Sequence, residues 1–527
     1  MESELKDMPK DLSMSGIENI NTFNNIDEFI NAVLDADAGD LIILTKAKDE
    51  EGYTVDKDED EDTTFTIEGT AKNPVIVMAQ EPGKVILAGS AGYIFDKCKY
   101  LTWYGFKHLH EGRTQTKNIS FRSCKNTRFA RCEVELKDII PEEDKGDPDK
   151  DKRHWLHLNN CEGMIVDHCN FHDKNSRGQF CNVRGKSDNP VGQGPVFEYN
   201  RFERHTYVDP DNPGDSGGEA IQMGESTEDR YYFRAVVRYN YFEECNGDPE
   251  IVTNKSSGNL YYNNSFVKHL GSLTLRHGDS TAVLGNYFEA SGLRVGGAYN
   301  LIANNHFTLN SADEDKPQRS PLVLHNGDDE EPKKGSWERV IDNHILLNTF
   351  ANGEGTAHYI VYWGEDKGHK PIGTEFRGNI ITAQNGKLLG FDNDASASDN
   401  TIADNIAWKT GNAEYGEFDP NNDPNEKMAI REDPLLTPKD TNLDGIYRLQ
   451  NDSSPACKIF QGKGELFKKF TDVDIYGVTR IGDTHAGCYQ YTAESEKPKK
   501  RITKDDVGLD AWTSLGDSPS WPLQVEM

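Results

Sequence analysis

The sequence has no long hydrophobic run. None of its apolar stretches approaches the ~18 residues that a membrane-spanning helix needs, and the mean hydropathy is −0.75. Basic residues are also scarce, because 58 Lys and Arg stand against 89 Asp and Glu, a formal net charge of −31. A chain this acidic repels the phosphates of nucleic acids and of anionic membranes. We therefore expect no membrane span and no nucleic-acid partner, and an anionic ligand would require a local basic patch.

Cysteine motifs and a leader-type segment are absent as well. The nine cysteines include no CxxC pair and no zinc-type Cys/His spacing, so we interpret them as packing residues. The first residues, MESELKDMPKDLSMSG, contain no apolar stretch of the signal-peptide type. The sequence therefore predicts either a cytoplasmic protein, or a secreted or periplasmic one whose signal peptide has been removed. It leaves the oligomeric state open.

What the sequence does contain is a repeat. A short apolar segment that ends in Asn or Cys, followed by one variable and one apolar residue, recurs along the chain. Its anchor positions are Cys132, Cys169, Asn200, Asn240, Asn264, Asn286, Asn305, Asn343, Asn379 and Asn405. From Asn240 to Asn305 the anchors are 24, 22 and 19 residues apart, which fits coils of three short strands at ~3.3 Å per residue. The repeat predicts a parallel β-helix in which anchor Asn residues of successive coils bond to one another.

The ends of the repeat region differ from its middle. Residues 27–34 have apolar residues at helical spacing and precede AGDLIIL, which we predict as the first strand. Such a helix would cover the open edges of the first coil. The predicted fold is all-β, a single right-handed parallel β-helix with an N-terminal capping helix. Its predicted boundaries are an extension at 1–24, the β-helix domain at 25–492 and a charged tail at 493–527.

The densest cluster of polar signals lies at residues 246–278. Asp248 and Glu250 are two apart and would share one face of a strand, where two carboxylates can bind a hard cation. Lys255 follows, and Arg276 comes 21 residues later, about one coil, which would place the two side by side across the sheet at ~4.8 Å. The sequence therefore predicts one patch of acids and bases. The alternative is a solvated ladder of opposite charges without function.

The order of the residues in this cluster favours function. EIVTNKSSGN followed by GSLTLRHGD resembles polysaccharide lyase family 6, the alginate lyase and chondroitinase B-type enzymes. Further similar segments are NPVIVMAQEPGKVILAG, LTWYGFKH, VDHCNFHDKNSRG, GGEAIQMGES and GLRVGG, so the resemblance spans roughly residues 25–490. It implies a β-elimination on a uronic-acid polysaccharide.

The resemblance also implies roles for individual residues. Lys255 would be the base that removes the proton from carbon 5 of the uronate, and Arg276 would assist proton return to the leaving oxygen. Calcium would be the cofactor, with Glu250 and Asp248 as ligands and Ser216 as a third. The implied substrate-binding residues are His277, Arg294, Gln222, Lys174 and Arg177.

Three of these positions depart from the family pattern. Ser216 stands where the family has Asn, Asp248 where it has Glu, and Gln222 where it has Arg. A hydroxyl is a weaker calcium ligand than an amide oxygen, so the sequence leaves open whether calcium binds or the enzyme is metal-independent. Alginate is the predicted substrate. The alternatives are dermatan sulfate and a non-catalytic polysaccharide-binding β-helix, whereas a glycoside hydrolase would need paired aspartates at coil spacing, which are absent.

Other candidates have weaker signals. Glu219 would orient the site or bind metal, and Arg319 would reach the groove from an acidic loop. Tyr359, Tyr362 and Trp363 would stack on sugar rings, although strand alternation favours core packing for part of this cluster.

Overall fold

The computed structural model describes most of the chain and divides it into two compact units. The described residues are 9–48, 50–57, 62–147, 149–185, 194–206, 217–308, 320–328, 336–352, 357–364, 367–392, 397–437, 445–461, 467, 470, 472–480, 484–491 and 501–511. Unit 1 comprises residues 1–222, 233–236 and 504–512, and unit 2 comprises 223–232, 237–503 and 513–527. Each unit is described by itself below.

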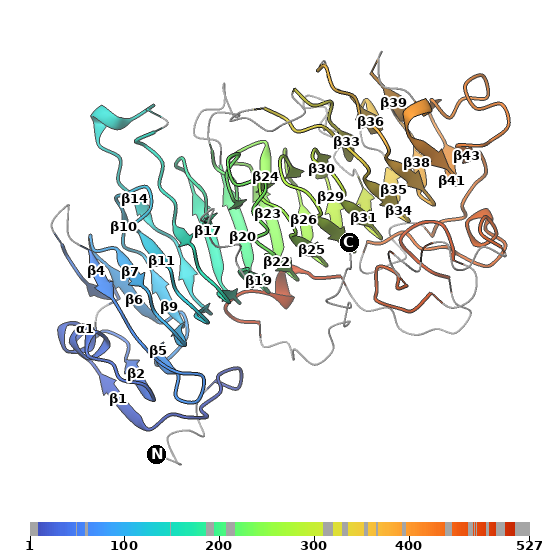
Figure 1. The fold of residues 1–527 in the computed structure, drawn as a ribbon. Helices are drawn as coiled ribbons and strands as arrows, with labels where there is room; N and C mark the ends of the chain where they lie inside the picture. The colour runs from blue at the N-terminus through green and yellow to red at the C-terminus, as the bar shows by residue number, and fades with distance from the viewer. Residues whose placement is uncertain are drawn as a thin grey trace. The chain divides into compact units, whose positions relative to one another are not determined.

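Unit 1 consists of three parallel sheets, and the chain visits them in turn, so that neighbouring strands of one sheet come from successive coils (Figure 1). The first contains β1 (Asn19–Phe23), β2 (Asp40–Leu44), β5 (Val75–Ala79), β8 (Leu101–Tyr104), β12 (Arg128–Ala130), β16 (Ile165–Asp167) and β19 (Val196–Glu198). The second contains β4 (Thr63–Phe65), β7 (Tyr93–Asp96), β11 (Ile119–Arg122), β15 (Leu156–Asn159) and β18 (Cys181–Arg184). The third contains β3 (Tyr53–Thr54), β6 (Val85–Ala88), β9 (Phe106–His108), β13 (Glu133–Val134), β17 (Asn170–Lys174) and β20 (Arg201–His205), and β10 (Glu111–Gly112) pairs separately with β14 (Lys137–Asp138).

Unit 2 repeats the same arrangement. One sheet contains β25 (Leu260–Tyr262), β28 (Ala282–Leu284), β31 (Leu301–Ala303), β34 (His344–Leu346), β37 (Glu375–Arg377) and β40 (Thr401–Ala403). The second contains β24 (Glu250–Asn254), β27 (Ser272–Leu275), β30 (Gly292–Val295), β33 (Leu322–Leu324), β36 (Tyr359–Trp363), β39 (Lys387–Phe391) and β42 (Glu414–Gly416). The third contains β23 (Tyr241–Cys245), β26 (Ser265–Val267), β29 (Tyr287–Glu289), β32 (His306–Thr308), β35 (Thr349–Asn352), β38 (Ile380–Ala383), β41 (Asn405–Lys409) and β43 (Ala429–Ile430). Strands β21 (Ile221–Met223) and β22 (Val236–Arg238) fall where the units divide, and the three-strand coils confirm the predicted parallel β-helix.

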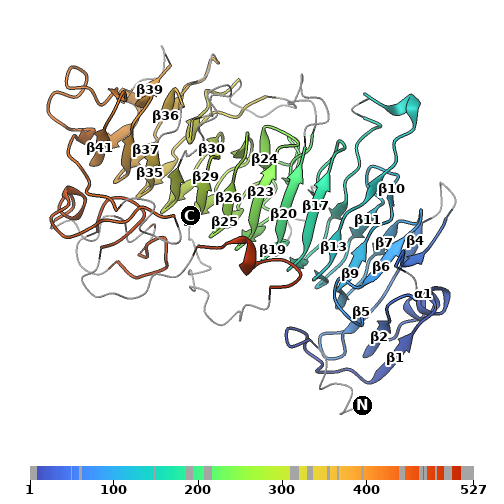
Figure 2. The same cartoon turned by 180° about the vertical axis from the view of Figure 1, so that it is seen from behind.

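The predicted capping helix is α1 (Ile26–Leu34), beside β1 and β2 at one end of unit 1 (Figures 1 and 2). The side chain of Asn25 accepts hydrogen bonds from the backbone of residues 27 and 28 and so starts the helix. Its buried face places Phe29 6.5 Å from Trp103 and 6.0 Å from Phe106, ring centre to ring centre. The helix therefore covers the open end of the core. Strand β1, which the sequence analysis did not predict, precedes it and pairs with β2.

Asparagine ladders join the coils of unit 2, as the repeat predicts. The Oδ1 atom of Asn264 accepts from the amide of Asn240 at 3.0 Å, and that of Asn305 accepts from Asn286 at 3.1 Å. The next member is Asn348, whose Oδ1 lies 3.0 Å from the Nδ2 of Asn305, rather than the predicted Asn343. The prediction of Asn343 as an anchor is wrong because anchors follow a strand of the first sheet, whereas Asn343 precedes β34. Inside the coils, phenylalanine rings stack at 4.6–4.9 Å, and all nine cysteines are buried and free.

The end of the chain packs against the coils. In unit 2, Arg480 donates to Asn304 at 2.7 Å, and the backbone of Cys488 donates to the hydroxyl of Thr349 at 3.0 Å. In unit 1, the buried guanidinium of Arg131 donates to the carboxylate of Asp11 at 2.7 Å and to the carbonyls of residues 509 and 511. The boundary of a separate tail at 493 stays a prediction, since residues 501–511 alone of that range are described. No helix within the described ranges is both long and apolar enough to cross a membrane.

Candidate functional site

Three neighbouring strands of unit 2 present the cationic residues of the cluster. Lys255 directly follows β24, Arg276 directly follows β27, and Arg294 lies within β30. The backbone N–H of Arg276 donates to the carbonyl of Asn254 at 3.0 Å, and Thr274 is paired with Arg294 in the next strand. The separation of 21 residues therefore places Lys255 and Arg276 at the same position of adjacent coils.

Polar residues of the motif hold the turn that carries Lys255. The amide of Asn254 donates to the carbonyls of Ser256 (2.8 Å) and His277 (3.0 Å). Its Oδ1 accepts from the amide of Asn259 at 2.7 Å and from the hydroxyl of Tyr261 at 2.9 Å. These bonds tie the turn after β24 to the turn after β27, so the two cations are held by one buried hydrogen-bond network.

Gly278 is required for the close approach of these two turns. Its φ is +89°, and a Cβ there would lie 2.3 Å from the carbonyl oxygen of Ser256. Any side chain would push the coils apart at the point where Arg276 and His277 are placed. This contact explains why the motif LRHG ends in glycine.

One buried carboxylate lies among the three cations. Glu250 is 5% exposed, and its Oε1 lies 3.2 Å from Arg276 and 3.9 Å from Arg294. Its Oε2 accepts from the hydroxyl of Thr253 at 2.8 Å. Burial opposes the charged form, but the charges of Arg276, Lys255 and Arg294 outweigh it and lower the pKa of Glu250. The cluster therefore holds three positive charges around one carboxylate.

His277 is fully buried beside these cations. Burial, and then the charges of Arg276 and Lys255, lower its pKa to about 3, so the imidazole is neutral at neutral pH. Within the described residues neither ring nitrogen has a hydrogen-bond partner. An unpaired buried polar group costs ~1–3 kcal/mol, and such groups in native structures call for an explanation such as a catalytic or binding role.

An aromatic support lies under the two arginines, and the sequence analysis missed it. The ring of Trp337 lies 5.3 Å from the guanidinium of Arg276 and 4.4 Å from that of Arg294. His325 stacks on Trp337 at 3.7 Å and accepts from the Nε of Arg294 at 3.1 Å. The sequence signal was a tryptophan directly after a polar insertion, which alone does not show which coil it contacts.

The residues on both sides of Trp337 also contact the site. The Nε of Arg276 donates to the carbonyl of Ser336 at 3.4 Å, and the backbone N–H of Gly278 donates to Glu338 at 3.1 Å. Burial, and then the charge of Asp279, raise the pKa of Glu338 to about 7. Residues 336–338 thus hold the turn that presents Arg276.

The other predicted substrate contacts lie in unit 1. Lys174 is 1% exposed, and its ammonium lies 2.6 Å from Asp138. Arg177 lies 3.0 Å from Asp151, and Gln222 is buried on β21. Lys174 and Arg177 thus form buried ion pairs. Substrate binding by these two residues and by Gln222 stays a prediction.

The remaining candidates have different outcomes. Glu219 is buried and accepts from the amide of Gln179 at 2.6 Å. Trp363 is fully buried, whereas Tyr359 and Tyr362 are half-buried, so the strand divides the aromatic cluster between core and surface. Ser216 and Arg319 lie outside the described residues.

Of the predicted calcium ligands the structure describes Asp248 and Glu250, whereas Ser216 lies outside the described residues. Both oxygens of Glu250 are engaged, and the Oδ1 of Asp248 accepts from the backbone N–H of Glu250 at 3.0 Å. Arg276, Arg294 and Lys255 lie around these two carboxylates. A divalent cation is held by oxygen ligands that carry excess negative charge, so the two carboxylates do not fit such a cation.

A second acidic group in unit 1 has the spacing of a metal site. One ligand atom each of Glu133, Glu135 and His172 lies within 4.8 Å of the others. The ammonium of Lys107, at 2.7 Å from Glu133 and 3.4 Å from Glu135, already neutralises the group.

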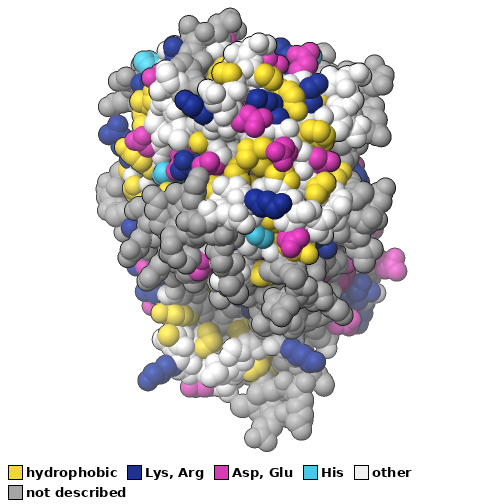
Figure 3. Space-filling view, turned by 90° about the vertical axis from the view of Figure 1, so that its right-hand side faces the viewer, with side chains coloured by type: hydrophobic (Ala, Val, Ile, Leu, Met, Phe, Trp, Pro, Cys, Tyr) yellow, Lys and Arg dark blue, Asp and Glu magenta, His cyan; other side chains and the backbone are white. Residues whose placement is uncertain are grey.

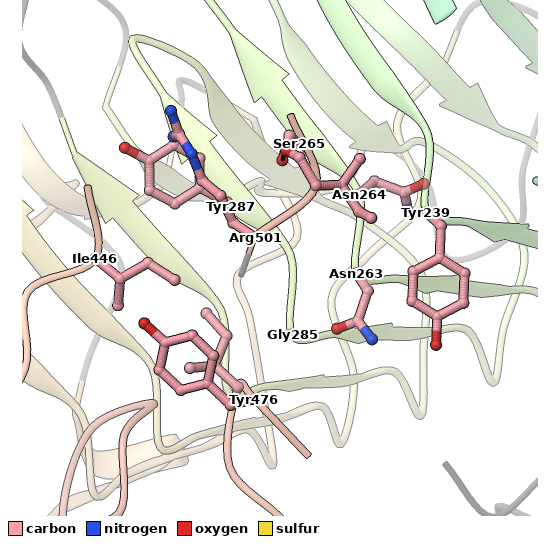
Figure 4. A pocket seen from close by; sticks show the side chains of 11 residues that line it. Tyr239, Asn263, Asn264, Ser265, Gly285, Tyr287, Ile446, Tyr476 and Arg501 are labelled. Carbon is pink, nitrogen blue, oxygen red and sulfur yellow. Dashed lines mark hydrogen bonds between the residues drawn. The ribbon is translucent and has the colours of Figure 1, made fainter. Parts of the chain in front are cut away.

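Two further observations concern the surface. A cavity of about 60 Å³ lies between β26, β29 and the end of the chain, where Tyr287, Tyr476 and Arg501 surround it (Figure 4). This volume holds about two waters at ~30 Å³ each, not a sugar ring. On the face in Figure 3, basic and acidic side chains of the described residues alternate between hydrophobic ones. That face therefore shows no extended basic field.

Comparisons with known proteins place the fold. A family model described as Chondroitinase B matches residues 23–414. The fold is similar to that of the polysaccharide lyase family 6 alginate lyase AlyGC, with a TM-score of 0.69 and 19% identity over 94% of this chain and 59% of that chain. It is also similar to a mannuronic acid specific family 6 lyase from human gut microbiota, with a TM-score of 0.60 and 21% identity over 74% of this chain and 86% of that chain.

A polysaccharide lyase from Pseudopedobacter saltans has a TM-score of 0.50 and 17% identity, over 79% of this chain and 97% of that chain. At these identities the structural likeness shows a shared fold. This chain spans about 60% of the length of AlyGC. No curated protein matches the sequence significantly.

Proposed function

This chain belongs to the chondroitinase B family, and we propose that it is a polysaccharide lyase. It cleaves a uronic-acid polymer by β-elimination, and alginate is the preferred candidate substrate. The observation that carries the proposal is the grouping of three cations, Lys255, Arg276 and Arg294, around Glu250. Lys255 and Arg276 at adjacent coil positions, with Arg294 beside them, form a built anion site in an acidic chain.

The chemistry requires such a site. The proton beside a carboxylate is weakly acidic, because its removal spreads a second negative charge onto an already anionic group. Guanidinium groups placed against the substrate carboxylate stabilise that developing charge. In this proposal Arg294 and the neutral imidazole of His277 bind the substrate, and Arg276 faces the bond that breaks.

Lys255 is the proposed base. Its ammonium has no ion pair within the described part of the chain, and its turn is fixed by Asn254 and Asn259. The amine accepts the proton from carbon 5 of the uronate, and the C–H electron pair forms the C4–C5 double bond. The C4–O bond breaks with its electron pair on the leaving oxygen, and Arg276 assists the return to that oxygen of the proton that Lys255 took up. The products are an unsaturated uronate and a new chain end.

Calcium is not needed for this scheme. The role of neutralising the substrate carboxylate falls to Arg276 and Arg294, because Glu250 already faces Arg276 at 3.2 Å and Asp248 accepts from the backbone N–H of Glu250. We therefore propose a metal-independent lyase, and a chelator should change the rate less than twofold. Loss of activity with chelator, restored by calcium, would overturn this part of the proposal.

Dermatan sulfate is the second candidate substrate. The matching family description favours it. Alginate is preferred because a sulfated polymer calls for additional cations, and Gln222 stands where the related sequences carry Arg. A polymeric substrate also implies export, so we propose a secreted or periplasmic location.

The test is the ultraviolet absorbance of the unsaturated product. Polymannuronate, polyguluronate and dermatan sulfate are compared, each with calcium and with chelator. Lys255→Ala should abolish the signal, whereas Lys268→Ala, which removes an exposed lysine of the same unit, should leave it unchanged. A flat trace on all substrates with polymer still bound in gel retardation would overturn the lyase and leave a polysaccharide-binding β-helix.

A further inference from the structure

A larger cavity lies on the same sheet as Lys255, Arg276 and Arg294, farther along unit 2. It has a volume of about 500 Å³ and is lined by residues of β36, β39 and β42 and of the segments around them. In the strand order β36 is two strands beyond β30 and β42 is four strands beyond it, or ~10 and ~19 Å at the spacing of a sheet. Figure 1 shows β30, β33, β36 and β39 in succession.

The cavity contains two pairs of a lysine and a tyrosine. The ammonium of Lys387 lies 6.0 Å from the ring centre of Tyr359, and that of Lys409 lies 5.5 Å from the ring centre of Tyr415. Both lysines are exposed and both tyrosines are half-buried. Each pair therefore offers one aromatic ring and one mobile positive charge.

A glycine holds the first ring against the sheet. A Cβ at Gly390 would lie 2.2 Å from two ring atoms of Tyr359, so any other residue would displace that ring. Tyr362 stacks on Tyr359 at 4.8 Å and 20° and supports it from the neighbouring position. The ring is thus fixed in place as part of the cavity wall.

The charges of the cavity remain available to a ligand. Lys387 lies 3.8 Å from Glu414, but both side chains are largely exposed, and a surface pair of this kind contributes little. No ion pair to Lys409 exists within the described residues. Three carboxylates, those of Glu414, Glu417 and Asp419, also line the cavity and can accept hydrogen bonds from hydroxyl groups, so only the sugar carboxylates, and not the sugar hydroxyls, require the two ammonium groups.

We propose that this cavity is an accessory binding site for a uronate-containing oligosaccharide. Each tyrosine ring takes the apolar face of one sugar, and the adjacent ammonium binds its carboxylate, so the two pairs accommodate two uronates. The proposal rests on the proposed function, because the site would hold a polymer on the sheet that presents Lys255. Tyr415 lies just beyond the matched residues 23–414.

The test is binding of a hexauronate, measured by titration calorimetry in the Lys255→Ala background. The double variant Lys387→Ala/Lys409→Ala should raise the Kd about tenfold, since it removes two ammonium–carboxylate contacts. The matched control Lys268→Ala/Lys458→Ala removes the same charge from exposed lysines that do not line the cavity and should leave the Kd within twofold. Equal affinity of the two double variants would overturn the site.

A neutral hexasaccharide and the kinetics complete the test. Neutral cellohexaose bound as tightly as the hexauronate would overturn the uronate class. With Lys255 present, the double variant should raise KM for the polymer and leave cleavage of a trisaccharide within twofold of the control. If no substrate gives product but hexauronate binding still depends on Lys387 and Lys409, the lyase proposal fails and the accessory site stands.

Discussion

Two clusters of buried charge in this protein use the same residue types with opposite results. In unit 1 Lys174 is paired with Asp138 at 2.6 Å and Arg177 with Asp151 at 3.0 Å, one cation to one carboxylate. In unit 2 three cations surround the single carboxylate of Glu250. A one-to-one ion pair cancels its own charge, whereas cations grouped around a shared carboxylate can attract an anion from solution.

The comparison shows that stoichiometry and burial, not residue type, separate a structural ion pair from a binding site. Lys174 also donates to Ser176 at 2.5 Å and lies 4.9 Å from the ring of Trp155, so its hydrogen-bonding capacity is used inside the protein. Lys255 is half-buried and has no such partner within the described residues. The cluster around Glu250 therefore groups three cations in a chain whose net charge is −31.

The largest expected effect is on the cluster of cations around Glu250. Lys255→Met should reduce kcat at least ~10³-fold, because it removes the proposed base, while the free energy of unfolding changes by less than ~1 kcal/mol. Product absorbance and urea unfolding measure the two quantities. A large loss of stability would show that Lys255 is a structural residue like Lys174.

The ion pair of Lys174 and Asp138 in unit 1 should show the opposite result, a loss of stability without a loss of activity. Lys174→Met leaves Asp138 buried without its cation, so the free energy of unfolding should fall by ~3–5 kcal/mol, with kcat of the folded enzyme unchanged. Urea unfolding and kinetics on the folded fraction check this. Weaker polymer binding at unchanged stability would instead identify Lys174 as a substrate contact.

A smaller effect is expected at the aromatic support. Trp337→Leu removes the ring beneath Arg276 and Arg294, and the loss of two cation–π contacts of ~0.5–2 kcal/mol each implies a drop in kcat/KM of about fivefold to a thousandfold. Trp408→Leu, on β41, is the control and should change kcat/KM less than twofold. Equal effects of both variants would contradict the support role of Trp337.

The smallest effect is a slope in stability with pH. The pKa of Glu338 is raised to about 7 in the folded protein, above its ordinary value near 4.5, so the folded state binds more protons between these values. Its contribution to stability is thus largest below pH ~4.5 and is lost as the pH rises toward 7. Glu338→Gln should remove that part of the slope in urea unfolding from pH 4.5 to 7.5. An unchanged slope would exclude Glu338 as its source.

The repeat in the sequence predicted much of the site. A separation of about one coil placed Arg276 beside Lys255, and residues two apart placed Asp248 and Glu250 together, because the period of a β-helix converts sequence distance directly into spatial distance. Where loops interrupt the period this rule fails. The anchor assigned to Asn343 belongs to Asn348, because a long insertion precedes both and hides the phase of the coil.

The sequence by itself determined the β-helix, its capping helix and the adjacent coil positions of Lys255 and Arg276, since these follow from short-range periodicity. Only the tertiary structure decided which charges are compensated. Trp337 and His325 reach the arginines from later coils, and Glu250 is shared among three cations. Such partners are set by packing between coils that insertions of variable length separate, so their distances along the chain follow no fixed period.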